Sequence, residues 1–399
     1  MTTLAAATSL GGVPEAIAAL AVGGTALLLA FASLTRPAAR LARWPLASAL
    51  LGGGWIALAC GVALGPLGVG LLRRESVAEL EPLGQMCLAW IGLLVGMQMK
   101  GSLLAAVPPS LLRWIILDAI VSFAGAATVA WWALRTAAPQ TDLRSMWPLL
   151  AMVGAASIGW SGELRSLHGL DARASRVAAL IQGGAGLASA IAIVASDMFT
   201  MKPGGSTSLI TTLAIAAAAT LALRSTLGTE TGNQGRLTLA LIGTLALVAG
   251  AAALTGTSTL PGAFLLGMAI TNLRGGSMRR MERLVYESEP AVAAVFFLLS
   301  GIILGRTPGW WPWMIAGGLL LVRIVAKPVV ARIALGSAWD EPGAQRLRPA
   351  PVRQAPIAVA LAVATLLAHD TGAERGCLLA LVLCGLGSGV LPLLWRAQA

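Results

Sequence analysis

Charged residues are scarce in this 399-residue chain. They make up 11% of it, whereas soluble domains carry about 25%. Histidine occurs twice, tyrosine once and cysteine four times, while hydrophobic residues make up 57%. A soluble globular protein needs a charged, hydrated surface, which this composition cannot supply. The composition therefore predicts a polytopic membrane protein that lies in the lipid bilayer.

The hydrophobic residues fall into thirteen runs that read as helices crossing a bilayer. A hydrocarbon core of about 30 Å needs roughly 20 apolar residues per helix. The predicted spans are residues 14–34, 46–64, 84–99, 112–134, 146–163, 175–197, 207–225, 236–255, 259–272, 291–304, 310–334, 354–369 and 377–395. These runs lack the alternation of barrel strands. We predict an all-α polytopic membrane protein that forms a single membrane domain over residues 1–399, with no soluble domain.

Several kinds of functional site find no support in the sequence. The cysteines lie inside apolar runs, and neither histidine has metal-ligand spacing, so we predict no metal and no cofactor. No Ser/His/Asp arrangement or phosphate-binding loop occurs, so we predict that the chain is not an enzyme. The net charge of +11 comes from basic residues scattered over short loops, which does not indicate nucleic-acid binding.

The distribution of Lys and Arg predicts how the chain is oriented. These residues collect in the loops that follow odd-numbered spans. Basic loops remain on the cytoplasmic side of a membrane. We therefore expect a multi-pass protein of the cell membrane, a bacterial inner membrane, with an external N-terminus and a cytoplasmic C-terminus.

Four stretches carry short motifs in a characteristic order. They are GVALGPLGVGLL, LEPLGQMCLAWIGLLVGMQMK, GTSTLPGAFLLGMAITNL and ESEPAVAAVFFLLSGIIL. Together they resemble the membrane domain of the cation:proton antiporter superfamily, closest to the branch with the glutathione-gated potassium efflux systems. The resemblance implies a sodium/proton-antiporter-like fold of two inverted repeats, roughly 46–197 and 236–395, linked by the helix at 207–225. It also implies a homodimer.

The resemblance further implies two discontinuous helices that cross near the membrane midplane. By order these are the fifth and twelfth predicted spans. The fifth contains GAASIGWSGEL, in which Gly159 and Gly162 permit unwinding, and the twelfth contains Pro356, which removes a backbone donor. The family has a Ser/Thr-rich motif in the fifth span, and here Ile158, Gly159 and Trp160 take its polar positions.

The sixth predicted span contains no carboxylate. It reads AALIQGGAGLASAIAIVAS, whereas family members have an Asp here that binds the cation and protons in alternation. Gln182 aligns with the residue before that Asp, and Gly183 aligns with the Asp itself. An amide can coordinate a cation but cannot release a proton near neutral pH. The glycines are equally consistent with a tight helix crossing.

Four charged residues on other spans are candidates for an ion path. Arg323 and Lys327, in the eleventh span, either line that path or cap the carbonyl groups of a broken helix. Asp118, inside the fourth span, is either the partner of a basic residue or a relocated proton carrier. Glu163 either faces a cytoplasmic cavity or forms an ion pair with Arg165.

The leading functional prediction is a secondary transporter that exchanges a monovalent cation, sodium or potassium, for protons, with atypical coupling. One alternative is a non-transporting or sensory relative, which the missing carboxylate favours. The other is a carrier of an anionic or organic solute, which would suit the loss of the acid and the retention of internal cations.

Overall fold

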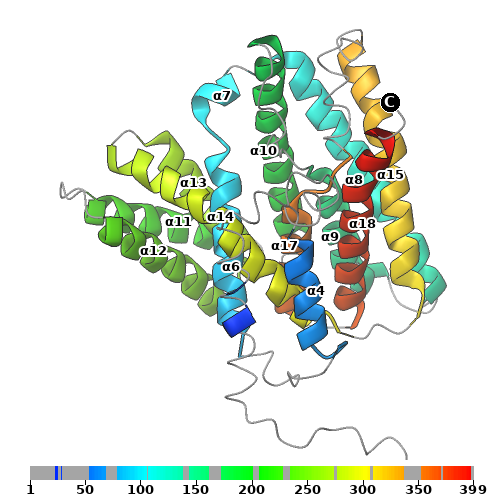
Figure 1. Cartoon of the computed structure of the whole chain (residues 1–399), viewed down its shortest axis with the longest axis horizontal. Coiled ribbons are helices and arrows are strands. Elements are labelled where there is room, and N and C mark those ends of the chain that lie inside the picture. The colour runs from blue at the N-terminus through cyan, green and yellow to red at the C-terminus, as the bar shows by residue number, and fades with distance from the viewer. Residues whose placement is uncertain are drawn as a thin grey trace, which may run out of the picture. The chain divides into compact units, whose positions relative to one another are not determined.

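The computed structural model describes residues 23–25, 28, 54–68, 79–105, 107–137, 143–160, 172–200, 206–227, 234–273, 276–305, 309–336, 352–369 and 372–396. This part of the chain forms thirteen helices and no strand (Figure 1). The helices are α4 (Trp55–Leu64), α6 (Glu81–Met97), α7 (Gly101–Ala105), α8 (Pro109–Ala137), α9 (Leu143–Ile158), α10 (Ala172–Thr200), α11 (Ser206–Leu227), α12 (Gln234–Thr255), α13 (Thr259–Asn272), α14 (Gly276–Ile303), α15 (Trp311–Leu335), α17 (Pro356–His369) and α18 (Gly372–Arg396).

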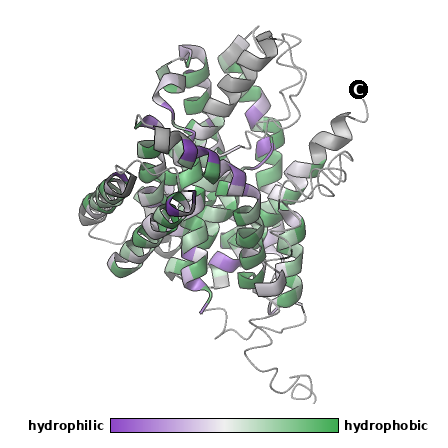
Figure 2. Ribbon diagram, turned by 60° about the vertical axis from the view of Figure 1, so that its left-hand side comes forward, coloured by the Kyte–Doolittle hydropathy of each residue, from purple (hydrophilic) through white to green (hydrophobic). Residues whose placement is uncertain are grey.

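The predicted all-α fold is confirmed, and apolar residues cover most of the helices (Figure 2). Five of the described helical segments are long and apolar enough to cross a membrane: Pro109–Ala137, Gln234–Thr255, Arg280–Ile303, Trp311–Ala334 and Ala373–Val390. Shorter apolar helices coincide with most of the other predicted spans. The predicted span 14–34 lies outside the described residues, apart from residues 23–25 and 28.

The start predicted for the tenth span was wrong. The sequence places it at residue 291, whereas α14 begins at Gly276. The added part reads GSMRRMERLVYESE, whose charges suggest a loop. Its apolar residues nevertheless recur with a helical period, and Met281 and Val285 are fully buried. The segment is therefore an amphipathic beginning of the same helix.

The chain divides into two compact units. Unit 1 comprises residues 1–81 and 290–306, and unit 2 comprises residues 82–289 and 307–399. In unit 1, α4 packs closely on the second half of α14. A methyl group at Gly61 would overlap the carbonyl oxygen of Leu298, and one at Gly301 would overlap that of Leu58. The two backbones therefore touch at glycines.

In unit 2, α6 and α13 make the same kind of contact. A methyl group at Gly96 would overlap the carbonyl oxygen of Phe264, and one at Gly267 would overlap that of Leu93. A methyl carbon at Gly92 would lie 2.6 Å from the carbonyl oxygen of Leu260. The buried residues of these helices form one core cluster with residues of α11, α12 and the first half of α14.

The other helices of unit 2 form a bundle built around α8 and α15. α8 packs on both α15 and α9, α10 packs on α9, and α18 packs on α15 and α17. Fully buried alanines at 126, 130 and 133 give α8 a smooth face. Small residues of this kind let neighbouring backbones approach closely. This bundle carries the charged residues that the sequence places inside spans.

Candidate functional site

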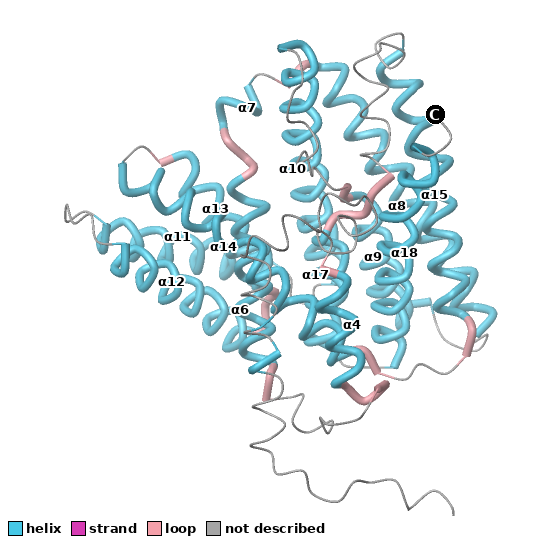
Figure 3. The backbone as a smooth tube through the Cα atoms, viewed as in Figure 1, coloured by secondary structure: helices cyan, strands magenta, loops and turns pink. Residues whose placement is uncertain are grey.

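Two non-helical segments meet inside the bundle of unit 2. α9 ends at Ile158, and the chain continues through Gly159 and Trp160 without helical structure. α17 begins at Pro356, and the four residues described before it are not helical (Figure 3). Trp160 and Gln354 form an isolated antiparallel bridge. The end of α9 and the segment before α17 therefore lie side by side, and carbonyl groups at a helix end and in non-helical backbone need partners outside the helix.

Arg323, on α15, supplies those partners. Its side chain is 1% exposed and donates four hydrogen bonds. The acceptors are the carbonyl oxygens of Ser157 at 2.9 Å, Gly159 at 2.6 Å, Val352 at 3.0 Å and Arg353 at 3.0 Å. One guanidinium group thus joins the end of α9 to the segment before α17, and its charge is offset by carbonyl dipoles.

Lys327 lies one turn further along α15, on the same face as Arg323. Its Nζ donates to Oδ2 of Asp118 on α8 at 2.6 Å, and the two side chains are 0% and 1% exposed. Lys327 also donates to the carbonyl oxygen of Ile158 at 3.2 Å, while the Ser122 hydroxyl donates to Oδ1 of Asp118 at 3.3 Å. The site is a fully buried ion pair beside the end of α9.

One of two stacked tryptophans lies beside this ion pair. The centroid of the Trp160 ring lies 5.3 Å from the Lys327 Nζ, in cation–π geometry. It also stacks on Trp114 of α8, with 5.1 Å between the ring centroids and an interplanar angle of 23°. On another side, a methyl carbon at Gly184 of α10 would lie 3.3 Å from Cζ2 of Trp160. Sequence reasoning noted Trp160 only as a departure from a polar motif and missed this packing role.

Four of the predicted site residues lie together in the structure: Asp118, Gly159, Arg323 and Lys327. A fifth, the helix-break candidate Pro356, begins α17. Two others, Gln182 and Gly183, belong to α10, and the structure describes only their backbone. The last two predicted site residues, Gly162 and Glu163, lie outside the described part of the chain.

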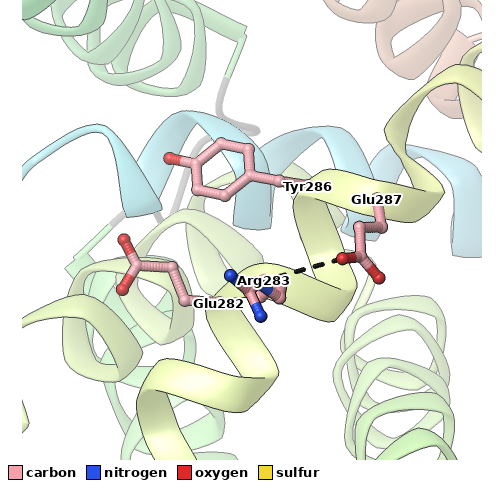
Figure 4. Close-up of a pocket in the computed structure, with 4 residues that line it drawn as sticks. All are labelled: Glu282, Arg283, Tyr286 and Glu287. Carbon is pink, nitrogen blue, oxygen red and sulfur yellow. Dashed lines mark ion pairs between the residues drawn. The ribbon is translucent and has the colours of Figure 1, made fainter.

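A second polar group lies on α14, around a surface hollow (Figure 4). The hollow is lined by Glu282, Arg283, Tyr286 and Glu287. Arg283 and Glu287 form an exposed ion pair at 4.0 Å, and Glu282 lies 3.9 Å from the ammonium of Lys100. Exposed pairs contribute at most about 1 kcal/mol. These residues form a polar surface, so the buried Asp118–Lys327 pair is the stronger candidate for a functional site.

Apolar helices packed around a buried charged pair are those of a multi-pass membrane protein. A family model described as "Sodium/hydrogen exchanger, transmembrane" matches residues 28–383, so the chain belongs to the sodium/hydrogen exchanger family. Members of this family are secondary transporters and not enzymes. This confirms the family predicted from the sequence motifs.

Comparison with solved structures supports the same fold. The chain is similar to the sodium proton antiporter MjNhaP1 from Methanocaldococcus jannaschii at pH 8, with a TM-score of 0.62 and 14% identity. The similarity covers 96% of this chain and 98% of the other. At this identity the likeness establishes the shared fold. A search of curated proteins finds no match.

Proposed function

We propose that the chain exchanges a monovalent cation, sodium or potassium, for protons, and that Asp118 and Lys327 couple the two fluxes. The observation that carries this proposal is the buried ion pair beside the end of α9, where α9 meets the segment before α17. The pair supplies a carboxylate and an ionisable amine beside the two segments that the family resemblance implies to be the crossing helices. It would replace the carboxylate that the sixth predicted span lacks.

Charge balance explains how such a pair would couple the fluxes. A metal cation that binds Asp118 takes the place of the Lys327 ammonium as the counterion. If Lys327 kept its proton, three positive charges, including that of Arg323, would face one carboxylate. Two like charges about 4 Å apart repel by about 4 kcal/mol at an effective dielectric constant of about 20. Entry of the cation therefore expels the proton from Lys327, and one proton leaves for each cation bound.

The choice of cation and the assembly are part of the same proposal. The name of the structural relative MjNhaP1 supports sodium, and the motifs resembling potassium efflux systems support potassium. The resemblance also supports a homodimer built on two inverted repeats. The distribution of basic residues supports an external N-terminus, a cytoplasmic C-terminus and a bacterial inner membrane.

A non-transporting or sensory relative is the second candidate, and one observation favours it. The pair is fully buried, and Trp160 fills the space beside it with an indole ring where the family has small polar residues. The anion-carrier alternative finds less support, since Arg323 already uses four of its five N–H groups on backbone carbonyls. Little of its donor capacity remains for an anion.

Purified protein in proteoliposomes with an internal pH-sensitive dye tests the proposal. An imposed sodium or potassium gradient should drive proton movement in the wild type, and Asp118→Asn should abolish it. The matched control is Asp197→Asn, the same chemical change near the end of α10, which should leave the flux unchanged. Flux that survives Asp118→Asn would refute the assigned site. A wild-type protein that is silent with both cations would favour the non-transporting alternative.

A further inference from the structure

We propose that Trp160 is an aromatic plug that closes the Asp118–Lys327 pair and acts as the third partner of the Lys327 ammonium. Removing its ring opens the pair to water and ions. The closure itself is independent of transport, whereas its consequence for ion movement rests on the proposed function.

The indole ring contacts three helices that surround the ion pair. It stacks on Trp114 of α8, meets Gly184 of α10 and lies over Lys327 of α15. Trp160 is 1% exposed, so its whole ring fills interior space. Interiors are packed closely, and deleting a ring of this size leaves a void beside a charged pair. A void with polar walls admits water.

The ring also completes the surroundings of the ammonium. Lys327 has three N–H groups, and two of its partners are Oδ2 of Asp118 and the carbonyl oxygen of Ile158. The face of the Trp160 ring, whose centroid lies 5.3 Å from Nζ, is the third partner of the ammonium. An aromatic face attracts a desolvated monovalent cation in the same way as it attracts an ammonium. A cation that displaced Lys327 would therefore meet the same ring.

The glycine in α10 fits this role. A methyl carbon at Gly184 would lie 3.3 Å from the Trp160 ring and 3.5 Å from Cδ1 of Ile115. A larger residue at this position would press on the plug. Gly184 and the tryptophan thus match each other in volume, and Gly184 lies on the same helix from which the family's carboxylate is missing.

The plug is held by packing and by its backbone. The main chain at Trp160 is tied to Gln354 by the antiparallel bridge. The indole Nε1, in contrast, is buried without a hydrogen-bond partner among the described residues. A buried unpaired donor is destabilising, so packing and the backbone bridge, and no hydrogen bond of the indole, hold the ring in place.

Access to Asp118 can be measured with a water-soluble carbodiimide, without any transport assay. The reagent activates the Asp118 carboxyl group; the Lys327 amine then attacks, and an amide forms as the reagent leaves as a urea. Mass spectrometry quantifies the peptide that joins α8 to α15. We expect little cross-link in the wild type and a several-fold increase in Trp160→Ala. Trp160→Phe, which keeps an aromatic ring, should stay near the wild-type yield.

Two controls make the outcome decisive. Trp132→Ala makes the same change at a 58% exposed tryptophan on α8 and should not raise the yield, and Asp118→Asn should give no product. Equal yields in the wild type, Trp160→Ala and Trp160→Phe, in monodisperse protein, would overturn the plug even if exchange is intact. A raised yield in Trp160→Ala with no exchange in any variant would support the plug and refute the proposed transport.

Discussion

The Asp118–Lys327 pair should behave as one energetic unit. Its 2.6 Å separation gives an attraction of about 6 kcal/mol at an effective dielectric constant of about 20. Desolvation of two buried charges offsets much of that gain. Asp118→Asn or Lys327→Met alone leaves one buried charge without its partner, which costs about 3–5 kcal/mol. The double variant removes both charges and should lose no more than about 2 kcal/mol, which is far less than the sum of the single losses.

The free energy of unfolding can be measured for this cycle by SDS titration in mixed micelles, followed by tryptophan fluorescence. We expect a coupling energy of about 4 kcal/mol or more for the buried pair. The matched control is the same cycle at Lys100 and Glu282, which lie 3.9 Å apart with partly exposed side chains. Exposed pairs contribute below about 1 kcal/mol. A coupling energy for the buried pair as small as that of the control would refute the reasoning.

Three further predictions concern single positions. Arg323→Lys should lower the free energy of unfolding by about 2–4 kcal/mol in the same titration. An ammonium cannot donate to all four carbonyl oxygens, and each carbonyl left unpaired costs about 1–3 kcal/mol. A loss below about 1 kcal/mol would show that other donors bind these carbonyl groups. Gly96→Ala should be strongly destabilised by overlap with the Phe264 carbonyl group, while Gly243→Ala, with no atom within 4 Å, should be unchanged or up to about 1 kcal/mol more stable. Gly183→Asp should raise or newly confer pH-dependent cation exchange in proteoliposomes, and equal behaviour of Gly183→Asn would mean that no vestigial ion site exists there.

Hydropathy alone predicts most helices, since an apolar run has one stable form in a bilayer. The bounds predicted for the ninth span, 259–272, are those of α13. Gly256, which has a φ of +67°, and Ser258 separate this helix from α12. The start of α14 was missed because the helix begins with an amphipathic segment and not with an apolar run. Its first turns carry charges on one face and bury Met281 and Val285 on the other, so average hydropathy hides the helix.

The site was only partly predictable. A carboxylate or a lysine inside an apolar run needs a partner, which marks Asp118 and Lys327 as candidates. Their pairing depends on the packing of α8 on α15, between residues that are 209 positions apart in the chain. Trp160 gave no comparable signal, because a tryptophan in an apolar segment looks like ordinary core. Only its contacts with the ammonium and with Gly184 reveal its role.

The backbone contacts between α6 and α13 have a mechanical consequence. Most helix interfaces adapt to motion by changing side-chain rotamers. At Gly92, Gly96 and Gly267, carbonyl oxygens of one helix rest directly against the α-carbons of the other. No side chain lies between the two backbones to rearrange, so sliding one past the other would break the contact outright. We therefore expect the two helices to move as one unit in a transport cycle, with any hinge outside this contact.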